Sequence, residues 1–300
     1  MLAAGNPAGK GKRAPAHTPL RRGPRAAKLR HQSTHGNRAA VPDSRTGAVT
    51  MSAARIAKGI LDLLLPPSCL SCGSLVRADA GAGLRPLCDA CRDELSALVS
   101  QAACARCGHS VGPYATCSLC LDASPPFAAA VRIGLYDGPL ARLVQVVKYR
   151  GVRCGAPLLA DMLLAKLHQA RVADQVDAVA AVPLHWWRFY RRGYNQAALL
   201  ARALRARGLA APLVRPLVRT RDTRPQVGLS RRARLENVRG AFRVRRPEAV
   251  RGRRFLLVDD VMTTGATAGT CARELLRAGA RSVAVAVAAV AEGGRQTMAS

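Results

Sequence analysis

One segment near the C-terminal end constrains the fold more than any other feature of the chain. Residues 255–267 (FLLVDDVMTTGAT) begin with a run of four apolar residues, which two adjacent carboxylates, a loop of small and hydroxyl-bearing residues, and the start of a helix follow. A strand that leads directly into a helix is half of a βαβ unit, and such units build parallel sheets covered by helices. We therefore expect an α/β fold with this segment at the carboxyl edge of the sheet.

Strands and helices alternate through the rest of the C-terminal half, which predicts a mainly parallel sheet flanked by helices. The expected strands are Val131–Tyr136, Ala178–Pro183, Phe255–Val258 and Val283–Val290. The expected helices are Leu140–Tyr149, Pro157–Ala170, Gln196–Arg207 and Thr267–Ala278, of which the last two end at Gly208 and Gly279. A short amphipathic helix is also expected at Ile56–Leu65, before Pro66 and Pro67.

The chemistry of residues 255–267 suits a phosphorylated ribose. Two carboxylates can accept hydrogen bonds from ribose hydroxyls, and the loop amides that meet the positive end of a helix can hold a phosphate dianion. Helix capping alone would not need two acids, three threonines and a glycine in this order. The chain has no GxxxxGK[ST] motif and no GxGxxG after a strand, so the P-loop and dinucleotide classes are excluded. The expected site is Val258, Asp259, Asp260, Met262, Thr263, Thr264, Gly265, Ala266 and Thr267.

Four CxxC pairs precede this domain, and they predict a small cysteine-rich zinc module. Two such pairs complete a closed tetrahedral zinc site, which is structural rather than catalytic. Sequential pairing gives C-x2-C-x15-C-x2-C and C-x2-C-x9-C-x2-C, and a cross-braced pairing of first with third and second with fourth fits as well. Cys154 and Cys271 lie outside the pattern and are expected to be small buried residues. The expected ligands are Cys69, Cys72, Cys88, Cys91, Cys104, Cys107, Cys117 and Cys120.

The formal net charge of +29 favours polyanionic partners such as nucleic acid, phosphorylated metabolites or anionic membrane. No apolar stretch is long enough to span a bilayer, since Val283–Ala291 is short and fits a buried strand. Residues 1–50 lack the apolar core of a secretory signal, so the ten cysteines favour reduced, metal-binding thiols over disulfides. We therefore expect a cytoplasmic protein with no transmembrane segment.

Residues 1–50 contain ten Lys or Arg residues and one acid, Asp43, and are expected to form a disordered basic leader. A nucleic-acid-binding tail and an organelle transit peptide both fit this composition. A third interpretation, which we prefer, is that the true start is Met51, where ordered patterning begins.

An arginine belt covers residues 185–254, which contain twenty arginines, no lysine and three acids. Because the guanidinium group is a planar fork that matches phosphate, the belt favours diphosphates or a nucleic-acid backbone. A solvated basic surface remains the alternative for any single arginine. An aromatic cluster in the belt could stack on bases or pack in the core; its members are Trp186, Trp187, Phe189, Tyr190 and Tyr194.

These motifs together resemble the ComF/GntX family, the competence-protein-F-like group of type I phosphoribosyltransferases. Residues 255–267 resemble the signature of those enzymes for phosphoribosyl pyrophosphate (PRPP), and the CxxC module is typical of the family. The resemblance covers about residues 56–292. The pair Trp186-Trp187 departs from the polar or basic residues expected there. Further matching motifs are Lys148-Tyr149-Arg150-Gly151, Val182-Pro183-Leu184 with Arg188, Arg192-Gly193-Tyr194-Asn195-Gln196, and Gln226-Val227-Gly228-Leu229 with Arg231, Arg234, Asn237, Val238, Gly240 and Phe242.

The resemblance implies a role for each part of the expected site. Asp259 and Asp260 are the implied catalytic pair on the ribose hydroxyls, and residues 263–267 are implied to hold the 5-phosphate. Magnesium is implied to bridge pyrophosphate and ribose oxygens. The segment Thr220–Phe242 resembles the flexible hood that covers the site in type I enzymes, with Gln226, Arg231, Arg234 and Asn237 as its site residues. The implied pyrophosphate-side residues are Pro183, Leu184, His185, Arg188 and Arg192.

Two functions are therefore expected from the sequence. The first is a phosphoribosyl transfer from PRPP, or another phosphorylated ribose ligand, to an unidentified acceptor. The alternative is a non-catalytic accessory protein that binds single-stranded DNA and acts with DNA-uptake machinery in competence. The expected organisation is the leader at 1–50, a helix plus double zinc ribbon at 56–124, and a phosphoribosyltransferase-like domain at 128–292.

Overall fold

The computed structural model describes residues 67–76, 87–111, 117–122, 124–149, 155–223 and 230–292. The basic leader at 1–50, the expected helix at Ile56–Leu65, Cys154 and the hood residue Gln226 lie outside the described residues. The chain divides into two units, Met1–Met51 and Ser52–Ser300, and the described residues belong to the second. None of the helices in the described part of the chain is long and apolar enough to cross a membrane.

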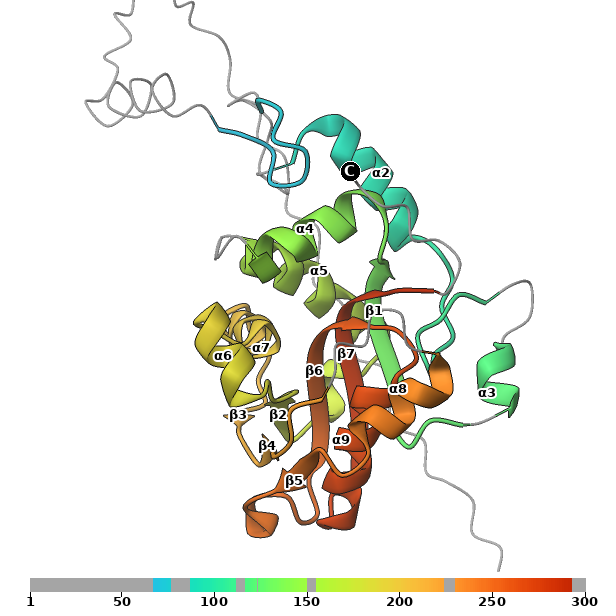
Figure 1. Ribbon diagram of the computed structural model, residues 1–300. Helices are drawn as coiled ribbons and strands as arrows, with labels where there is room; N and C mark the ends of the chain where they lie inside the picture. The colour runs from blue at the N-terminus through green and yellow to red at the C-terminus, as the bar shows by residue number, and fades with distance from the viewer. Residues whose placement is uncertain are drawn as a thin grey trace, which may run out of the picture. The chain divides into compact units, whose positions relative to one another are not determined.

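A parallel sheet of five strands confirms the α/β fold expected from the alternating pattern (Figure 1). Its order is β1-β7-β6-β2-β3, and every neighbouring pair is parallel. The strands are β1 (Ala129–Leu135), β2 (Ala178–Ala181), β3 (Leu213–Val214), β6 (Arg254–Met262) and β7 (Ser282–Val290). A separate antiparallel pair joins β4 (Leu217–Arg219) to β5 (Phe242–Val244).

Helices cover both faces of the sheet. One hydrophobic cluster joins the sheet to α2 (Asp89–Val99), α4 (Gly138–Tyr149), α5 (Gly155–Gln169) and α7 (Gln196–Ala206). The opposite cluster joins it to α9 (Ala266–Arg277), α8 (Arg231–Val238) and the β5 strand. The remaining elements are α3 (Ser118–Asp122), α6 (Trp186–Arg192), and the 3-10 turns η1 (Ala173–Gln175) and η2 (Pro247–Ala249).

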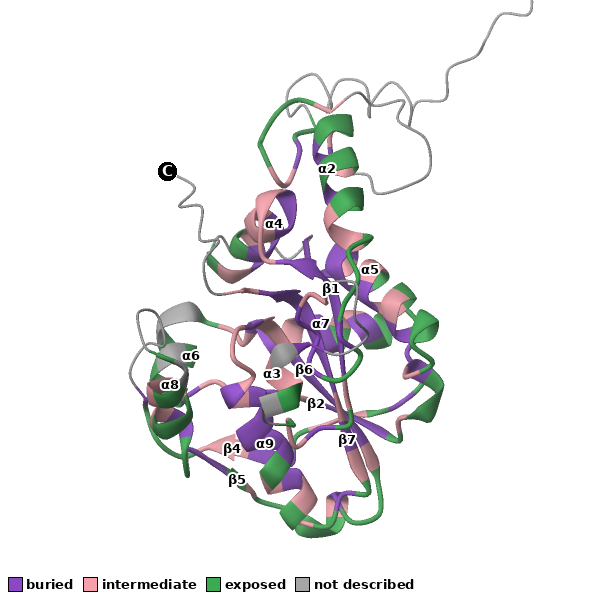
Figure 2. Ribbon diagram, turned by 90° about the vertical axis from the view of Figure 1, so that its right-hand side faces the viewer, coloured by how far each residue is buried: buried purple, intermediate pink, exposed green. Residues whose placement is uncertain are grey.

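Small aliphatic side chains fill the core, as the low aromatic content of 4% requires. The strand β7 has the sequence SVAVAVAAV, and six consecutive residues at its C-terminal end are buried (Figure 2). Such a continuous apolar run is typical of a parallel strand covered on both faces. Cys271 on α9 is fully buried in this core, which confirms the prediction of a small apolar role.

The structure extends one expected element. The strand expected at Phe255–Val258 continues as β6 to Met262, because β7 remains hydrogen-bonded beside it up to Val290. The segment that resembles a hood contains a helix, α8, which is capped by the Ser230 side chain that accepts from the Ala233 amide. Strands β4 and β5 pair at its two ends. The hood is therefore anchored to the fold on both sides of its undescribed portion.

Candidate functional site

Two adjacent carboxylates lie inside β6, at the carboxyl end of the central strands. Asp259 and Asp260 are both half-buried. The Asp260 amide donates to Asp259 Oδ1 over 2.9 Å, and the Val261 amide donates to Asp260 Oδ1 over 2.8 Å. Burial, together with the neighbouring Asp260 carboxylate, raises the pKa of Asp259 well above its ordinary value. A cation or hydroxyl-bearing ligand that compensates this pair would therefore bind favourably here.

Lys148, at the last turn of α4, already compensates one of the two charges. Its Nζ lies 3.2 Å from Asp260 Oδ2, and both side chains are less than one quarter exposed. Burial lowers the pKa of Lys148, but the Asp260 carboxylate together with Tyr149 and Tyr136 outweighs this effect, so the pKa is raised overall. The sequence marked Lys148 only as part of a motif and gave it no role, because nothing local connects α4 with β6.

Three consecutive motif residues, Tyr194, Asn195 and Gln196, connect the end of α4 with the end of β2. The Tyr194 hydroxyl donates to the Val147 carbonyl over 2.6 Å, and the Gln196 amide donates to the Lys148 carbonyl over 3.4 Å. Asn195 caps α7 and donates to the Val182 carbonyl over 3.0 Å. The motif thus ties the strand end of β2 to the helix that carries Lys148.

A phosphate loop, residues 262–267, connects the carboxylates to α9. Gly265 is the N-cap of α9 with a φ of 71°, a left-handed conformation that a residue with a side chain rarely adopts. The first amides of a helix have no partner within the helix, and for this reason a helix N-terminus that follows such a loop is suited to an anion. The Thr264 Oγ1 atom is buried and has no hydrogen-bond partner among the described residues. The loop thus leads directly from the carboxylates to the N-terminus of α9.

A cavity of about 600 Å³ lies at the carboxyl ends of β2 and β3 and contains part of the expected pyrophosphate side. Pro183 and Leu184 line it, together with Arg202 and Arg215. Neither guanidinium makes an ion pair or hydrogen bond within the described residues, so both are free to bind an anionic ligand. The sequence missed both arginines, because nothing distinguished them from the other eighteen in the belt.

Of the other expected pyrophosphate-side residues, His185 is not among the described residues that line this cavity, and the side chains of Arg188 and Arg192 lie outside the described part of the chain. His185 is buried at the N-cap of α6, with its Nδ1 atom 3.7 Å from Asp222 Oδ1. Arg188 and Arg192 lie on α6. The aromatic side chains of this helix do not pack in the core, since Trp186, Trp187, Phe189 and Tyr190 are 46–79% exposed.

The described hood residues fall into two groups. Val238 and Phe242 are fully buried and anchor the hood to the sheet. Arg231, Arg234 and Asn237 lie on α8, above the second hydrophobic cluster. The Arg221 guanidinium donates to the carbonyls of Asn237 and Arg239, which fixes the C-terminal end of α8.

Eight cysteines gather into two four-thiol clusters, and the pairing is sequential. In each cluster the four sulfur atoms lie within 4.8 Å of one another. The first ribbon uses Cys69, Cys72, Cys88 and Cys91, and the second uses Cys104, Cys107, Cys117 and Cys120. The cross-braced alternative is therefore excluded. Hydrogen bonds with Ser74 lower the pKa of Cys72 to about 6, which favours the thiolate that zinc requires.

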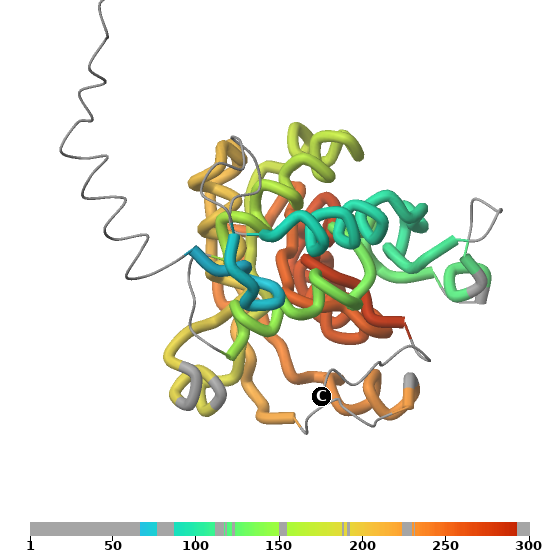
Figure 3. The backbone as a smooth tube through the Cα atoms, turned by 90° about the horizontal axis from the view of Figure 1, so that it is seen from above, coloured from blue at the N-terminus to red at the C-terminus, as the bar shows by residue number. Residues whose placement is uncertain are grey.

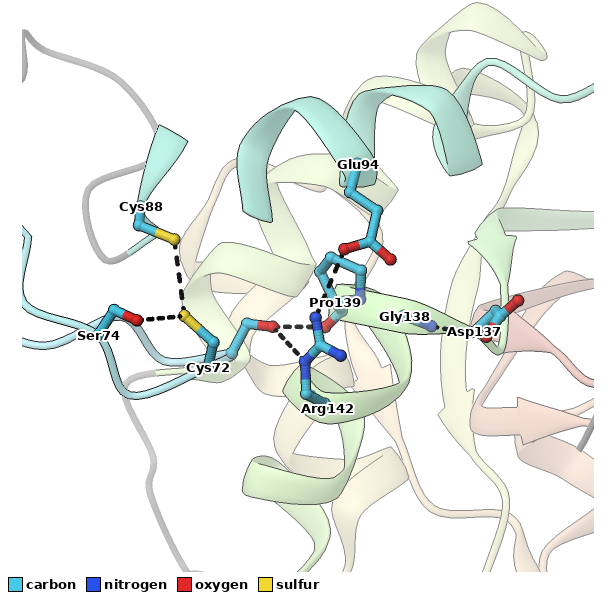
Figure 4. Close-up of polar contacts among 9 residues, drawn as sticks. Cys72, Ser74, Cys88, Glu94, Asp137, Gly138, Pro139 and Arg142 are labelled. Atoms are coloured by element: carbon cyan, nitrogen blue, oxygen red, sulfur yellow. Dashed lines mark hydrogen bonds and ion pairs between the residues drawn. The ribbon is translucent and has the colours of Figure 1, made fainter. Parts of the chain in front are cut away.

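The first ribbon packs against the start of α4 (Figures 3 and 4). The Arg142 side chain donates to Ser71 Oγ over 3.0 Å and forms an ion pair of 3.6 Å with Glu94 of α2. Cys69 and Cys91 belong to the same hydrophobic cluster as the sheet. The first ribbon is therefore packed against the rest of the fold.

The second ribbon covers the exposed edge of the sheet near the phosphate loop. The Ala130 amide of edge strand β1 donates to the Ala105 carbonyl over 3.0 Å. Arg132 is buried beneath the ribbon, where it donates to the Ala102 carbonyl and Ser110 Oγ. A Cβ at Gly108 would lie 3.6 Å from the Met262 side chain, which begins the phosphate loop. The ribbon and the candidate site therefore share a boundary.

Comparison with known proteins agrees with this architecture. Residues 60–122 match the model of the double zinc ribbon domain, and residues 161–299 match the phosphoribosyl transferase domain. A DNA utilization protein YhgH of Escherichia coli O157:H7 is 34% identical over 228 residues, which are 74% of this chain and 96% of that protein. The chain belongs to the ComF/YhgH family.

Other relatives extend the ComF/YhgH match. The YhgH protein of Salmonella typhi is 36% identical over 203 residues, which are 66% of this chain and 88% of the relative. Competence protein F of Haemophilus influenzae is 34% identical over 224 residues, which are 72% of this chain and 94% of the relative. The family resemblance, the phosphoribosyltransferase-like fold and the zinc-ribbon module expected from the sequence are thereby confirmed.

The two cysteine clusters predict that the purified ComF/YhgH chain carries about two zinc ions. Elemental analysis of reduced, metal-replete protein measures this directly. A value near one would mean that one cluster is empty of metal, and a value near zero would contradict the zinc assignment.

Lys148→Met is expected to lower the free energy of unfolding by about 1–3 kcal/mol, because it leaves the half-buried Asp260 carboxylate without its partner. Denaturant unfolding measures the loss. In an Asp260→Asn background the same change should cost much less, and Lys148→Arg should restore part of the stability. Equal costs in both backgrounds would show that the pair does not interact.

Proposed function

We propose that the chain binds PRPP, or another phosphorylated ribose, with magnesium at the carboxyl edge of the sheet and transfers the phosphoribosyl group to an acceptor. One observation carries the proposal: the carboxylate pair, the phosphate loop and a cavity with two free arginines meet at the ends of β6, β2 and β3. This is the order of groups that a ribose with a phosphate at C5 and a pyrophosphate at C1 presents.

In this proposal each part of the site has a separate task. Asp259 and Asp260 bind the ribose hydroxyls, and residues 262–267 hold the 5-phosphate at the start of α9. Arg202 and Arg215 bind the pyrophosphate, beside Pro183 and Leu184. The carboxylates offer the hard oxygen ligands that magnesium prefers, and the bound ion would neutralise pyrophosphate charge.

The transfer requires positioning and charge rather than a nucleophile of the protein. As the bond between C1 and the pyrophosphate oxygen breaks, its electron pair leaves with the pyrophosphate, and positive charge develops on the ribose ring. The carboxylates then face the ring, and the arginines face the departing pyrophosphate. An acceptor lone pair forms the new bond to C1.

The direct test is consumption of isotope-labelled PRPP across a panel of bases and amines. Release of labelled pyrophosphate that depends on one acceptor supports the proposal. An Asp259→Asn/Asp260→Asn variant serves as the control, since it should show no acceptor-dependent release. Release at equal rates by both proteins would assign the activity to a contaminant.

A second candidate function is binding of single-stranded DNA. It is supported by the exposed aromatic side chains of α6, because such rings stack on bases next to cationic side chains. Trp187 and Tyr190 form a stacked pair with ring centroids 6.3 Å apart. The relatives named for DNA utilization and competence favour the same partner. Phosphoribosyl binding and DNA binding would then use neighbouring surfaces.

Replacing Arg231, Arg232 and Arg234 by alanine is expected to weaken DNA binding and flatten its salt dependence. Each lost phosphate contact reduces the slope of log K against log salt by about 0.7 for a single strand. Fluorescence anisotropy with labelled oligonucleotide between low and high salt measures both effects. An unchanged slope would exclude α8 from the DNA-binding surface.

We also propose the division into a leader at 1–50, a zinc-ribbon region at 56–124 and a phosphoribosyltransferase-like domain at 128–292. The cysteine clusters and the five-stranded sheet support the last two parts.

A further inference from the structure

Lys148 already contacts a carboxylate that the proposed function assigns to the ribose and to magnesium. Its Nζ lies 3.2 Å from Asp260 Oδ2, and the two side chains are 24% and 22% exposed. The other oxygen, Asp260 Oδ1, accepts from the Val261 amide, and Asp259 Oδ1 accepts from the Asp260 amide. Main-chain amides thus hold one oxygen of each carboxylate, and an ammonium group holds the second oxygen of Asp260.

The space behind Asp260 is too small for a hydrated metal ion. A void of about 10 Å³ lies there, between Asp260 and side chains of α4, α5 and α7. A void of this size holds about one water molecule at most, whereas magnesium keeps several of its waters when it binds to carboxylates. A divalent ion that approaches Asp260 must therefore compete with Lys148 for Oδ2.

The side chain of Lys148 can move while its backbone stays fixed. Tyr194 donates to the Val147 carbonyl over 2.6 Å and Gln196 donates to the Lys148 carbonyl over 3.4 Å, so the end of α4 is anchored. The stem of a lysine is long and flexible, and its ammonium group is a compact point charge that binds phosphate as well as carboxylate. A change of rotamer alone can therefore move Nζ from Asp260 to a nearby anionic ligand.

Charge determines when this movement is favourable. A divalent ion that binds by itself would displace a mostly buried ammonium group and leave it beside a like charge, without its carboxylate. A ligand with a pyrophosphate group removes this penalty, because its oxygens can accept the metal ion and the ammonium group together. Binding of the metal alone is therefore disfavoured, and binding of the metal with its ligand is favoured.

We propose that Lys148 is a specificity-determining residue, which competes with free divalent cations for Asp260 and releases this carboxylate only to a cation that arrives with a phosphorylated ligand. In the bound state its ammonium group contacts the phosphate oxygens of the ligand. The inference deepens the proposed function and rests on it for the identity of the ligand. The competition at Asp260 requires only the metal, so the two can be tested separately.

Titration with Mn²⁺ alone, followed by electron paramagnetic resonance, tests the competition on the full, zinc-replete chain. Lys148→Met removes the competing charge and should bind Mn²⁺ about tenfold more tightly than the wild type. Adding Asp260→Asn to this variant should abolish the gain. Lys166→Met is the matched control, because it removes the same charge from α5, where Lys166 donates to the Val99 carbonyl. The control should bind Mn²⁺ as the wild type does.

The same variant should give the opposite result when Mn²⁺ and PRPP are added together. Lys148→Met should then bind the complex about fivefold more weakly than the wild type, because the ligand has lost the ammonium group. A merely structural role would not move the two affinities in opposite directions. Lys148→Gln keeps a hydrogen-bond donor without the charge, and it repeats both measurements if the methionine variant does not fold.

Equal Mn²⁺ affinities of Lys148→Met and the wild type would overturn the inference, as would an equal gain in Lys166→Met. Unchanged or tighter binding of the PRPP complex by Lys148→Met would also contradict it, because Nζ would then make no contact with the ligand. An absence of PRPP binding by the wild type, with the gain in Mn²⁺ affinity intact, would remove the proposed phosphoribosyl transfer and leave the competition at Asp260 standing.

Discussion

Replacing Asp259 and Asp260 by asparagine is expected to abolish binding of PRPP with magnesium while the sheet remains folded. Each carboxylate would lose charge-assisted hydrogen bonds of about 1.5–3 kcal/mol, so the double variant should bind ~100-fold more weakly or worse. Calorimetric titration measures the affinity. DNA affinity should stay equal or rise, because the change removes negative charge and leaves the arginine belt intact. Parallel loss of both ligands would mean that one site binds both.

The single variants Asp259→Asn and Asp260→Asn should differ in stability. The difference shows which of the two carboxylates stabilises the fold. A raised carboxyl pKa means that the folded state binds its proton more tightly than the unfolded chain. Ionisation of Asp259 therefore lowers the free energy of unfolding as the pH rises above 3.8, the ordinary pKa of this carboxyl. At neutral pH, Asp259→Asn should melt at an equal or higher temperature. Asp260→Asn should melt lower, because it leaves Lys148 without its carboxylate. A lower melting temperature for Asp259→Asn would contradict this account.

Loss of the second ribbon is expected to have a larger effect on ligand binding than loss of the first. Cys107→Ser removes one ligand of the cluster that borders the phosphate loop, whereas Cys72→Ser removes one from the cluster beside α4. Each variant should lose about one zinc, because structural zinc contributes much of the folding free energy of such small modules. Only Cys107→Ser should also lose PRPP binding, since the support of Met262 is lost with the ribbon.

Zinc content, melting temperature and PRPP affinity measured on the same two preparations test this difference. Both proteins should retain the circular dichroism of the five-stranded sheet. If the two variants lost PRPP binding to the same extent, the contact between the second ribbon and the phosphate loop would make no specific contribution to PRPP binding. If neither lost zinc, the clusters would tolerate three ligands.

Much of the fold could be predicted from the sequence, because local patterns carried the information. The apolar strand, the paired acids and Gly265 identified β6, the phosphate loop and α9, since each of these features is set within a few residues. The CxxC spacing predicted the clusters in the same way, but it is compatible with both pairings, of which the structure has the sequential one.

The features that could not be predicted depend on contacts between distant segments. Lys148 meets Asp260 across the top of the sheet, where the packing of α4 on the sheet and the hydrogen bonds of Tyr194 and Gln196 to the end of α4 bring the two together. Arg202 and Arg215 become distinctive only when α7 and β3 close a cavity around them. The extension of β6 past Val258 depends on its pairing with β7. The residues of a strand do not by themselves indicate which strand pairs with it.

Calorimetric titration of the full, zinc-replete chain with PRPP tests the central claim most directly. In buffer with magnesium the account predicts binding of about one PRPP per chain, with much weaker binding when magnesium is omitted. Ribose 5-phosphate, which lacks the pyrophosphate, should bind more weakly than PRPP because it leaves Arg202 and Arg215 without an anion. An absence of PRPP binding by the folded, zinc-loaded protein in magnesium would contradict the account, as would equal affinity for ribose 5-phosphate.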